Sequence, residues 1–234
     1  PELGDDVACV IVEPVAANMG LIAPARGFLE GLRTACDAAG ALLVFDEVIT
    51  GFRLGPGGAQ EHFGVRPDLS CFGKVIGGGL PVGAFGGRSD VMAALAPLGP
   101  VYQAGTLSGN PLATAAGLAV LSQLDDGAYR MLAGRAEQFA GWLRDVFVEV
   151  DLDVQVPVVG TLMGLYFGAS RAGDYDAARA TDEKRYAAFF HAMLERGVAF
   201  APGAYEVAFV SLAHTKEELE RVADLAAAAA REVS

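Results

Sequence analysis

The chain has 234 residues, of which 53% are hydrophobic and 20% charged, and its formal net charge is −12. This composition excludes a disordered chain and favours a buried sheet in one large domain or two modest ones. An acidic chain has no general affinity for nucleic acid or for an anionic membrane surface, because both partners need a basic face. The sequence shows no apolar stretch of membrane-spanning length and no signal-peptide pattern, so we expect a cytoplasmic protein.

Two further features of the sequence concern its setting. Cys9, Cys36 and Cys71 are odd in number and lie in apolar segments, so we expect buried free thiols of a reducing compartment. The sequence starts at Pro1 and enters an apolar strand within a few residues, which suggests a fragment of a longer protein.

The first part of the chain is typical of a β-α-β unit. Residues 7–13 form a β-branched run that Pro14 ends, which predicts a strand. Residues 24–40 have apolar side chains at helical spacing, and the apolar run 41–45 predicts the next strand. Two strands joined by a helix are expected to be parallel, so we predict an α/β fold with a mainly parallel sheet.

Asp46 comes directly after the second strand, where open α/β sheets gather their ligand-binding groups. Glu47 must face the opposite way, so the two acids cannot form a carboxylate pair for hydrolysis, and we expect Glu47 at a solvated strand end. Lys74 has apolar flanks, which predict a buried stem, and three glycines at 77–79 follow it. An acid and an amine at neighbouring strand ends suit a bound cofactor, since a carboxylate keeps a pyridine nitrogen protonated and a lysine condenses with an aldehyde.

The middle and the end of the chain predict further elements. We expect a short helix at 89–96 capped by Ser89 and Asp90, a Gly-rich loop at 99–111 and a helix at 112–124. After Asp125 the pattern of helix, strands, helix, strands and helix predicts a smaller α+β domain. We therefore divide the chain into 1–125, part of a large domain, and 126–234. The elements expected in the second part are helices at 129–147, 184–196 and 215–233, strand pieces within 153–167, and short strands at 197–200 and 207–212.

The three histidines do not have the spacing of a metal site. We expect His62 and His214 to make structural hydrogen bonds and His191 to lie on a helix surface.

Three long motifs carry a resemblance that covers nearly the whole chain. They are FDEVITGFR from Phe45, FGKVIGGGLPVGAFGGR from Phe72 and VYQAGTLSGNP from Val101. With them the chain resembles the class III, fold-type I, pyridoxal-phosphate aminotransferases, and the last two motifs are similar to those of the aminomutases within that family. The resemblance implies pyridoxal 5'-phosphate as cofactor, a large domain that continues into a small α+β domain, and a homodimer.

The resemblance also implies roles for single residues. Lys74 would be the Schiff-base lysine and proton shuttle, and Asp46 the partner of the pyridine nitrogen. Val48 would pack against the ring, and Asn18 would lie near the ring hydroxyl. The other implied residues are Gly105 and Thr106, which would bind the cofactor phosphate of the neighbouring subunit, and Glu206, which would lie near the substrate amine.

The activity that the resemblance implies is transfer of an amino group within one amino-aldehyde, converting glutamate-1-semialdehyde into 5-aminolevulinate for tetrapyrrole synthesis. Two alternatives stay open from the sequence. One is an ω-aminotransferase that uses a separate keto acid, and the other is a non-catalytic dimerisation remnant of the same fold. Members of the family carry a further N-terminal half with cofactor and substrate groups, so we expect this chain alone to bind the cofactor weakly and to turn over little.

Overall fold

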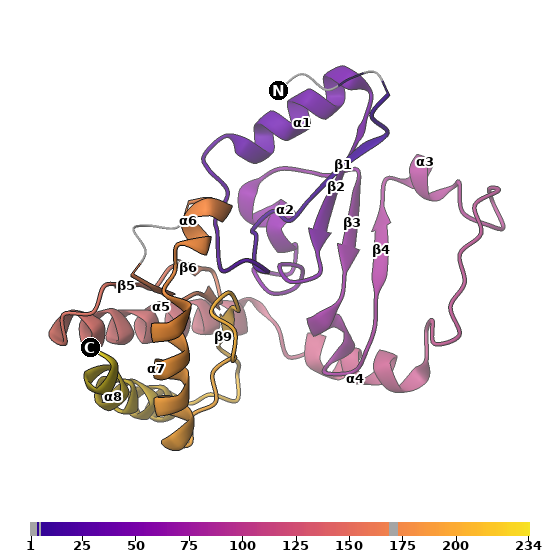
Figure 1. Ribbon diagram of the computed structural model, residues 1–234. Helices are drawn as coiled ribbons and strands as arrows, with labels where there is room; N and C mark the ends of the chain where they lie inside the picture. The colour runs from indigo at the N-terminus through magenta and orange to yellow at the C-terminus, as the bar shows by residue number, and fades with distance from the viewer. Residues whose placement is uncertain (1–3, 5, 169–172) are drawn as a thin grey trace. The chain divides into compact units, whose positions relative to one another are not determined.

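The computed structural model describes residues 4, 6–168 and 173–234 (Figure 1). The contacts divide the chain into two compact units. The first unit holds the described residues up to Pro14 together with Pro24–Asp126, and the second holds Val15–Ala23 together with the described residues from Gly127 onward. The sequence pattern does not indicate that Val15–Ala23 packs with the second unit. The division into domains at residue 125 stays a prediction.

The first unit is built on a four-stranded sheet in the order β1-β2-β3-β4 (Figure 1). The pairs β1-β2 and β2-β3 are parallel, and β3-β4 is antiparallel. The predicted α/β fold with a parallel-containing sheet is therefore confirmed. The strands are Cys9–Val12 (β1), Leu42–Glu47 (β2), Leu69–Phe72 (β3) and Ala84–Gly87 (β4).

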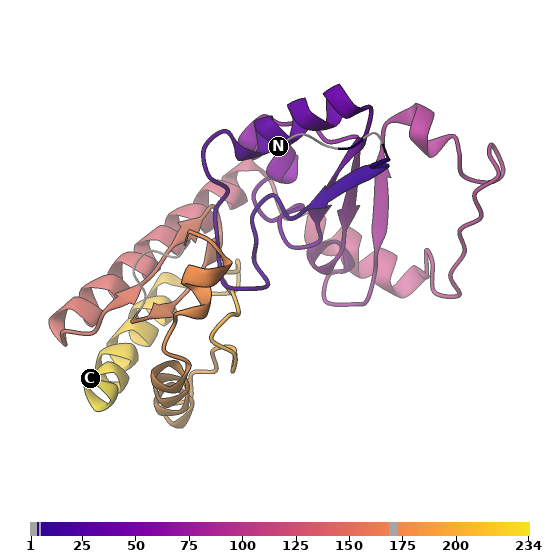
Figure 2. The same cartoon turned by 45° about the horizontal axis from the view of Figure 1, so that its top comes forward.

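Helix α1 (Phe28–Ala39) connects β1 to β2 and lies against these strands (Figure 2). Leu29 and Cys36 on the helix form a buried cluster with Leu43 and Phe45 of β2. The helix starts later than the predicted residue 24, but it ends as expected at Gly40, whose φ of 66° suits a residue without Cβ.

The remaining helices of the first unit come after β2, β3 and β4 in the sequence. They are α2 (Gly58–Phe63), the 3₁₀ helix η1 (Lys74–Gly77), α3 (Ser89–Met92) and α4 (Pro111–Leu121). Ser89 and Asp90 do not cap α3 as predicted, because Arg88 stands at the N-cap and its guanidinium pairs with the Asp90 carboxylate at 2.6 Å. Helix α4 has a true cap, since Asn110 Oδ1 accepts the Ala113 N–H at 2.9 Å.

The second unit contains four helices and five two-residue strands in its described residues. Its long helices confirm the predicted ones, and the predicted capping box is present between Thr215 and Glu218. No strand forms at 197–200, where the prediction is wrong, since the chain leaves the preceding helix at Gly197 with φ 81°. The elements are α5 (Asp126–Glu149), β5 (Val154–Gln155), β6 (Val158–Val159), β7 (Leu162–Met163), β8 (Tyr166–Phe167), α6 (Tyr175–Arg179), α7 (Glu183–Glu195), β9 (Ala208–Phe209) and α8 (Lys216–Val233).

The core of the second unit is aromatic. Phe147 of α5 packs against Phe167 and Phe189, with ring centroids 5.6 and 5.5 Å apart. These edge-on contacts join α5, β8 and α7 in one core. None of the helices in the described residues is long and apolar enough to cross a membrane.

The cysteines are all free, but their burial differs. Cys36 is buried as expected, and Cys71 is half-buried. Cys9 is exposed, contrary to the prediction, because it stands on β1, which is an edge strand with one face turned away from the core.

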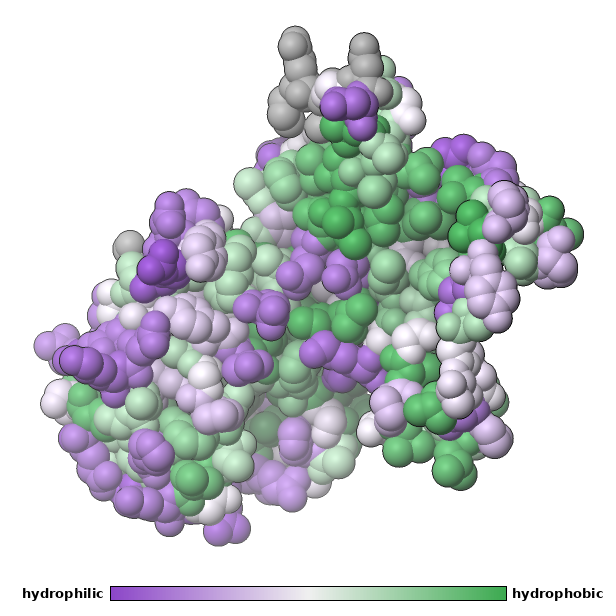
Figure 3. Space-filling model, turned by 45° about the vertical axis from the view of Figure 1, so that its right-hand side comes forward, coloured by the Kyte–Doolittle hydropathy of each residue, from purple (hydrophilic) through white to green (hydrophobic). Residues whose placement is uncertain are grey.

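Several large apolar side chains remain exposed on the first unit, where the space-filling view is largely green (Figure 3). Ile11 lies on the edge strand β1, Phe85 on β4, and Leu112 and Leu118 on α4. Exposed apolar surface of this kind is typical of an interface with further polypeptide.

Candidate active site

The structure brings Asp46 and Lys74 to the same edge of the sheet. Asp46 is the fifth residue of β2, and in the parallel register it lies opposite Cys71 of β3. Strand β3 ends one residue later at Phe72, and Lys74 begins η1 directly after Gly73. Both side chains therefore stand at the carboxyl ends of adjacent parallel strands, where α/β sheets bind ligands.

Val48 lies between these two residues. Its backbone N–H donates to Asp46 Oδ1 at 3.0 Å, which orients the half-buried carboxylate. Its side chain packs on Gly73, where an added Cβ would stand 3.3 Å from Val48 Cγ1. The strand ends thus carry a carboxylate from Asp46, an apolar side chain from Val48 and an amine from Lys74.

The Lys74 side chain is exposed, so the predicted burial of its stem is wrong. It lines an open cavity of about 730 Å³ together with Arg53, Leu80, Val82 and Val120, and this cavity keeps solvent in contact with the amine. The Lys74 backbone is left-handed with φ 46°, which is uncommon for a residue with a side chain. Arg53 was not singled out from the sequence, although it belongs to the same motif as Asp46.

Glu47 is fully buried, so the expectation of a solvated strand end is also wrong. Its Oε2 accepts the Ala59 N–H at 2.6 Å and the Thr50 hydroxyl at 3.2 Å. A Cβ at Gly58 would stand 2.2 Å from the same oxygen, and Gly58 has φ 60°. Glu47 therefore ties β2 to the start of α2 and has a structural role on the face opposite Asp46.

Asp68 is a second buried carboxylate that the sequence reasoning did not identify. It accepts Arg33 Nη1, Arg88 Nη1 and the Leu43 N–H, each at 2.7 Å. Burial by itself raises the pKa of Asp68, but these donors outweigh it and lower the pKa to about 2. No sequence motif points to this cluster, since its members are 20 to 35 residues apart.

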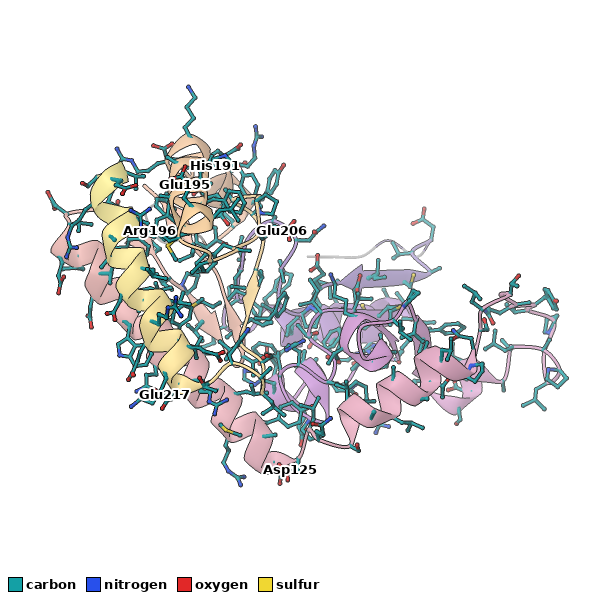
Figure 4. All side chains as sticks on the ribbon, turned by 90° about the horizontal axis from the view of Figure 1, so that it is seen from below. Asp125, His191, Glu195, Arg196, Glu206 and Glu217 are labelled. Carbon is teal, nitrogen blue, oxygen red and sulfur yellow. The ribbon has the colours of Figure 1, made fainter. Side chains whose placement is uncertain are left out.

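Asn18 and Glu206 belong to the second unit. Their segments meet, because Gly20 N–H donates to the Tyr205 carbonyl at 2.8 Å. Asn18 is exposed and lines a cavity of about 310 Å³ with Tyr175 and Tyr205. Glu206 is exposed in the loop between α7 and β9 (Figure 4).

Gly105 and Thr106 lie in the loop that leads to α4, and both are exposed. The loop turns at Gly105, whose carbonyl accepts the Ser108 N–H at 3.0 Å. The structure thus groups Asp46, Val48 and Lys74 closely, while Gly105 and Thr106 lie on a separate loop of the same unit.

The histidines have ordinary surroundings. His214 Nδ1 accepts the Ser211 N–H at 3.2 Å, as predicted for a structural hydrogen bond. His62 packs edge-on against Phe63 at 4.7 Å and is exposed on α2, and the hydrogen bond expected of it stays a prediction. His191 is exposed on α7, as predicted (Figure 4). Within 4, 6–168 and 173–234, no group of three or more His, Cys, Asp or Glu side chains is placed to hold a metal ion.

The residues at the strand ends fit a pyridine aldehyde. Asp46 offers an acceptor for a protonated ring nitrogen, Lys74 offers an amine for the aldehyde, and Val48 offers an apolar contact for the ring. The cavity beside Lys74 is lined by two cationic residues, Lys74 and Arg53, which suits an anionic ligand.

The fold and these strand-end groups define a pyridoxal-phosphate-type transferase fold, and the comparisons with known proteins give its family. The Aminotransferase class-III family model matches residues 2–228. This chain belongs to the class III aminotransferase family.

The chain is similar to several curated relatives that share one name. The chain is 56% identical to the glutamate-1-semialdehyde 2,1-aminomutase of Pelotomaculum thermopropionicum, over 95% of this chain and 52% of the relative. It is 50% identical to the enzyme of the same name from Desulforamulus reducens, over 96% and 52%. The chain therefore spans about half the length of the curated relatives that it matches.

Solved structures confirm the fold. An omega-transaminase from Sphaerobacter thermophilus matches with a TM-score of 0.90 and 32% identity, over 96% of this chain and 52% of the other. A glutamate-1-semialdehyde aminomutase from Pseudomonas aeruginosa, crystallised in complex with PMP, matches with a TM-score of 0.87 and 28% identity, over 98% and 53%. Structural likeness alone does not separate the two activities, because both proteins share this fold.

Proposed function

We propose that this chain supplies the reacting lysine and the ring-nitrogen acid of a pyridoxal 5'-phosphate-dependent aminomutase that converts glutamate-1-semialdehyde into 5-aminolevulinate. The observation that carries the proposal is the placement of Asp46 near the carboxyl end of β2 and of Lys74 two residues after the end of β3, which pairs with β2 in parallel. The identities of 56% and 50% to curated aminomutases favour this activity over others in the family.

When bound, the cofactor supplies an aldehyde or amine that exchanges with the substrate and a ring that accepts electrons. Lys74 would hold the cofactor through its amine and would move protons between neighbouring carbon atoms of the substrate. The open cavity around Lys74 leaves room for its side chain to swing between these positions. Asp46 would accept a hydrogen bond from the protonated ring nitrogen, and the bond from Val48 N–H keeps its carboxylate oriented.

Substrate and product are isomers, so the overall reaction needs no second substrate. The amino group and the carbonyl oxygen of two adjacent carbons exchange places. We assign Asn18 to the neighbourhood of the ring hydroxyl and Glu206 to that of the substrate amine. The contact between Gly20 and Tyr205 supports a shared role for their two segments.

The proposal includes a homodimer in which Gly105 and Thr106 bind the cofactor phosphate of the neighbouring subunit. The loop around them supports this, since Val101, Tyr102 and Leu107 expose 50%, 82% and 66% of their surface. Apolar side chains this exposed are covered when a second polypeptide packs on them. As a biosynthetic enzyme of this kind, the protein is proposed to act in the cytoplasm.

An ω-aminotransferase is the second candidate, because one of the matching structures carries that title. The two activities differ in their need for a keto acid. The test uses the protein at its natural length, loaded with pyridoxamine phosphate, and measures 5-aminolevulinate formed from glutamate-1-semialdehyde with and without 2-oxoglutarate. We expect 5-aminolevulinate at the same rate in both reactions and no glutamate, whereas an aminotransferase would pass the substrate amine to 2-oxoglutarate and form glutamate in place of 5-aminolevulinate.

The third candidate, a non-catalytic remnant, predicts a different result in the same assay. It gives no product in either reaction and no visible absorbance from bound pyridoxal phosphate. A Lys74→Ala variant should behave like such a remnant. Lys184→Ala serves as its matched control, because Lys184 is an exposed lysine on α7 of the second unit.

A further inference from the structure

The backbone that carries Lys74 is in direct contact with the backbone of α4. An added Cβ at Gly117 would stand 2.1 Å from the carbonyl oxygen of Ile76, inside η1. In the opposite direction, a Cβ at Gly78 would stand 2.3 Å from the carbonyl oxygen of Ala116. The two segments therefore approach so closely that only hydrogen atoms fit between them at these positions.

This contact acts on a residue with an unusual conformation. Lys74 has φ 46° and is the first residue of η1, and Gly78, which closes the same turn, has φ 58°. A left-handed backbone at a residue with a side chain persists only when its surroundings fix it. Gly117 is buried at the point of contact, and both contacting atoms belong to main chain, which cannot move aside as a flexible side chain can.

We infer that Gly117 is a positioning residue for Lys74. Because Gly117 has no side chain, α4 packs directly against η1, and this contact fixes the position of Lys74 relative to the ends of β2 and β3. This inference rests on the proposed function of Lys74. It concerns a residue that touches neither the cofactor nor the substrate, and it acts through the backbone of Ile76 and Gly77.

The effect of a side chain at this position follows from the distances. A contact of 2.1 Å must open by about 1 Å before any real Cβ is accommodated, so α4 and η1 must move apart, and the part of this shift that falls on η1 displaces Lys74. A misplacement of about 1 Å at a reacting group lowers turnover by about 10²-fold. We therefore expect Gly117→Ala to lower turnover by about that factor and to slow the reaction of Lys74 with pyridoxal phosphate.

The experiment compares three proteins at their natural length: unaltered, Gly117→Ala, and Gly134→Ala. Gly134 is the matched control, since it is also a helical glycine but an added Cβ there meets nothing within 4 Å. Each protein is incubated with pyridoxal phosphate, reduced with borohydride and digested, and the labelled Lys74 peptide is quantified. We expect strong labelling in the unaltered and Gly134→Ala proteins and slow, weak labelling in Gly117→Ala.

A second measurement separates positioning from general damage to the fold. Lys74→Ala and Lys74→Ala/Gly117→Ala are both assayed with added ethylamine, which replaces the missing amine and needs no help from η1. If Gly117 acts by positioning Lys74, the amine restores the same rate in both variants. Weaker rescue of the double variant would show a merely structural role and would overturn the inference.

The remaining outcomes are also decisive. Labelling and turnover of Gly117→Ala equal to those of the unaltered protein would overturn the inference while leaving the proposed function intact. Absence of label on Lys74 in the unaltered protein, with no amine rescue, would overturn the proposed function and the inference together.

Discussion

At the scale of single residues, Lys74 is the centre of the proposed chemistry. It is exposed beside a cavity that Arg53 also lines, and its backbone is left-handed with φ 46°. An exposed amine can reach an aldehyde only if the cofactor is brought to it. Asp46, on the neighbouring strand, is placed to bind the ring nitrogen and so to hold the cofactor near Lys74.

Replacing Lys74 by Ala removes the amine and leaves the backbone able to fold, since the side chain makes no buried contact. We expect turnover to fall by roughly 10²–10⁴-fold, because a positioned proton carrier contributes about that much. The rate of 5-aminolevulinate formation and the visible spectrum of bound cofactor measure the change. Substantial retention of both would contradict the assignment of Lys74.

At the scale of elements, the carboxylate of Asp68 joins four pieces of the first unit. Its donors come from Arg33 on α1, from the Leu43 main chain on β2 and from Arg88 after β4, while Asp68 itself precedes β3. The Asp68 side chain is only 6% exposed, so water screens these interactions little. These bonds therefore connect α1 and β2 to the residues before β3 and after β4.

This cluster makes the stability of the protein depend on acid pH. The pKa of Asp68 is about 2 in the folded protein against an ordinary value of 3.8, so folding favours its charged form. Its contribution of about 2 kcal/mol is therefore present above pH ~4 and is lost as the pH falls through about 2. Urea unfolding between pH 5 and 2 measures it, with Asp68→Asn as the reference.

The Asp68→Asn variant cannot lose a proton at this position, so it should be less stable at pH 5 and lose less stability toward pH 2. Carboxylates away from this cluster titrate equally in both proteins and cancel in the difference. Parallel stability curves across this range would show that Asp68 contributes no such dependence.

At the scale of the whole molecule, the proposed dimer predicts that subunits complement each other. If Gly105 and Thr106 serve the neighbouring site, a mixed dimer of Lys74→Ala and Thr106→Asp subunits contains one site with both defects and one intact site. Co-expression of the two variants should then restore about a quarter of the normal activity, because half of the dimers are mixed and each has one working site.

Two controls make the complementation test sharp. Each variant expressed alone should have little activity, since Thr106→Asp sets a negative charge against the cofactor phosphate. If the loop instead serves its own subunit, every site in the mixed dimer has one defect. Co-expression would then restore nothing.

The sequence by itself determined the fold class, most of the helices and strands and the family. Hydrophobic periodicity and the Gly and Pro boundaries are local, so the parallel β1-β2 pair and the capping box of α8 could be read from them. The positions of Asp46 and Lys74 at strand ends followed for the same reason. The motifs around them are continuous in sequence and need no long-range contact to be found.

Only the tertiary structure decided burial and partnership between distant residues. It showed that Glu47 is buried under α2, that Lys74 and Cys9 are exposed, and that Asp68 gathers two arginines. It also brought Gly117 within contact of the turn that carries Lys74, across about 40 residues of chain. Alternation along a strand predicts which side chains share a face, but what covers that face depends on packing between elements that no local pattern specifies.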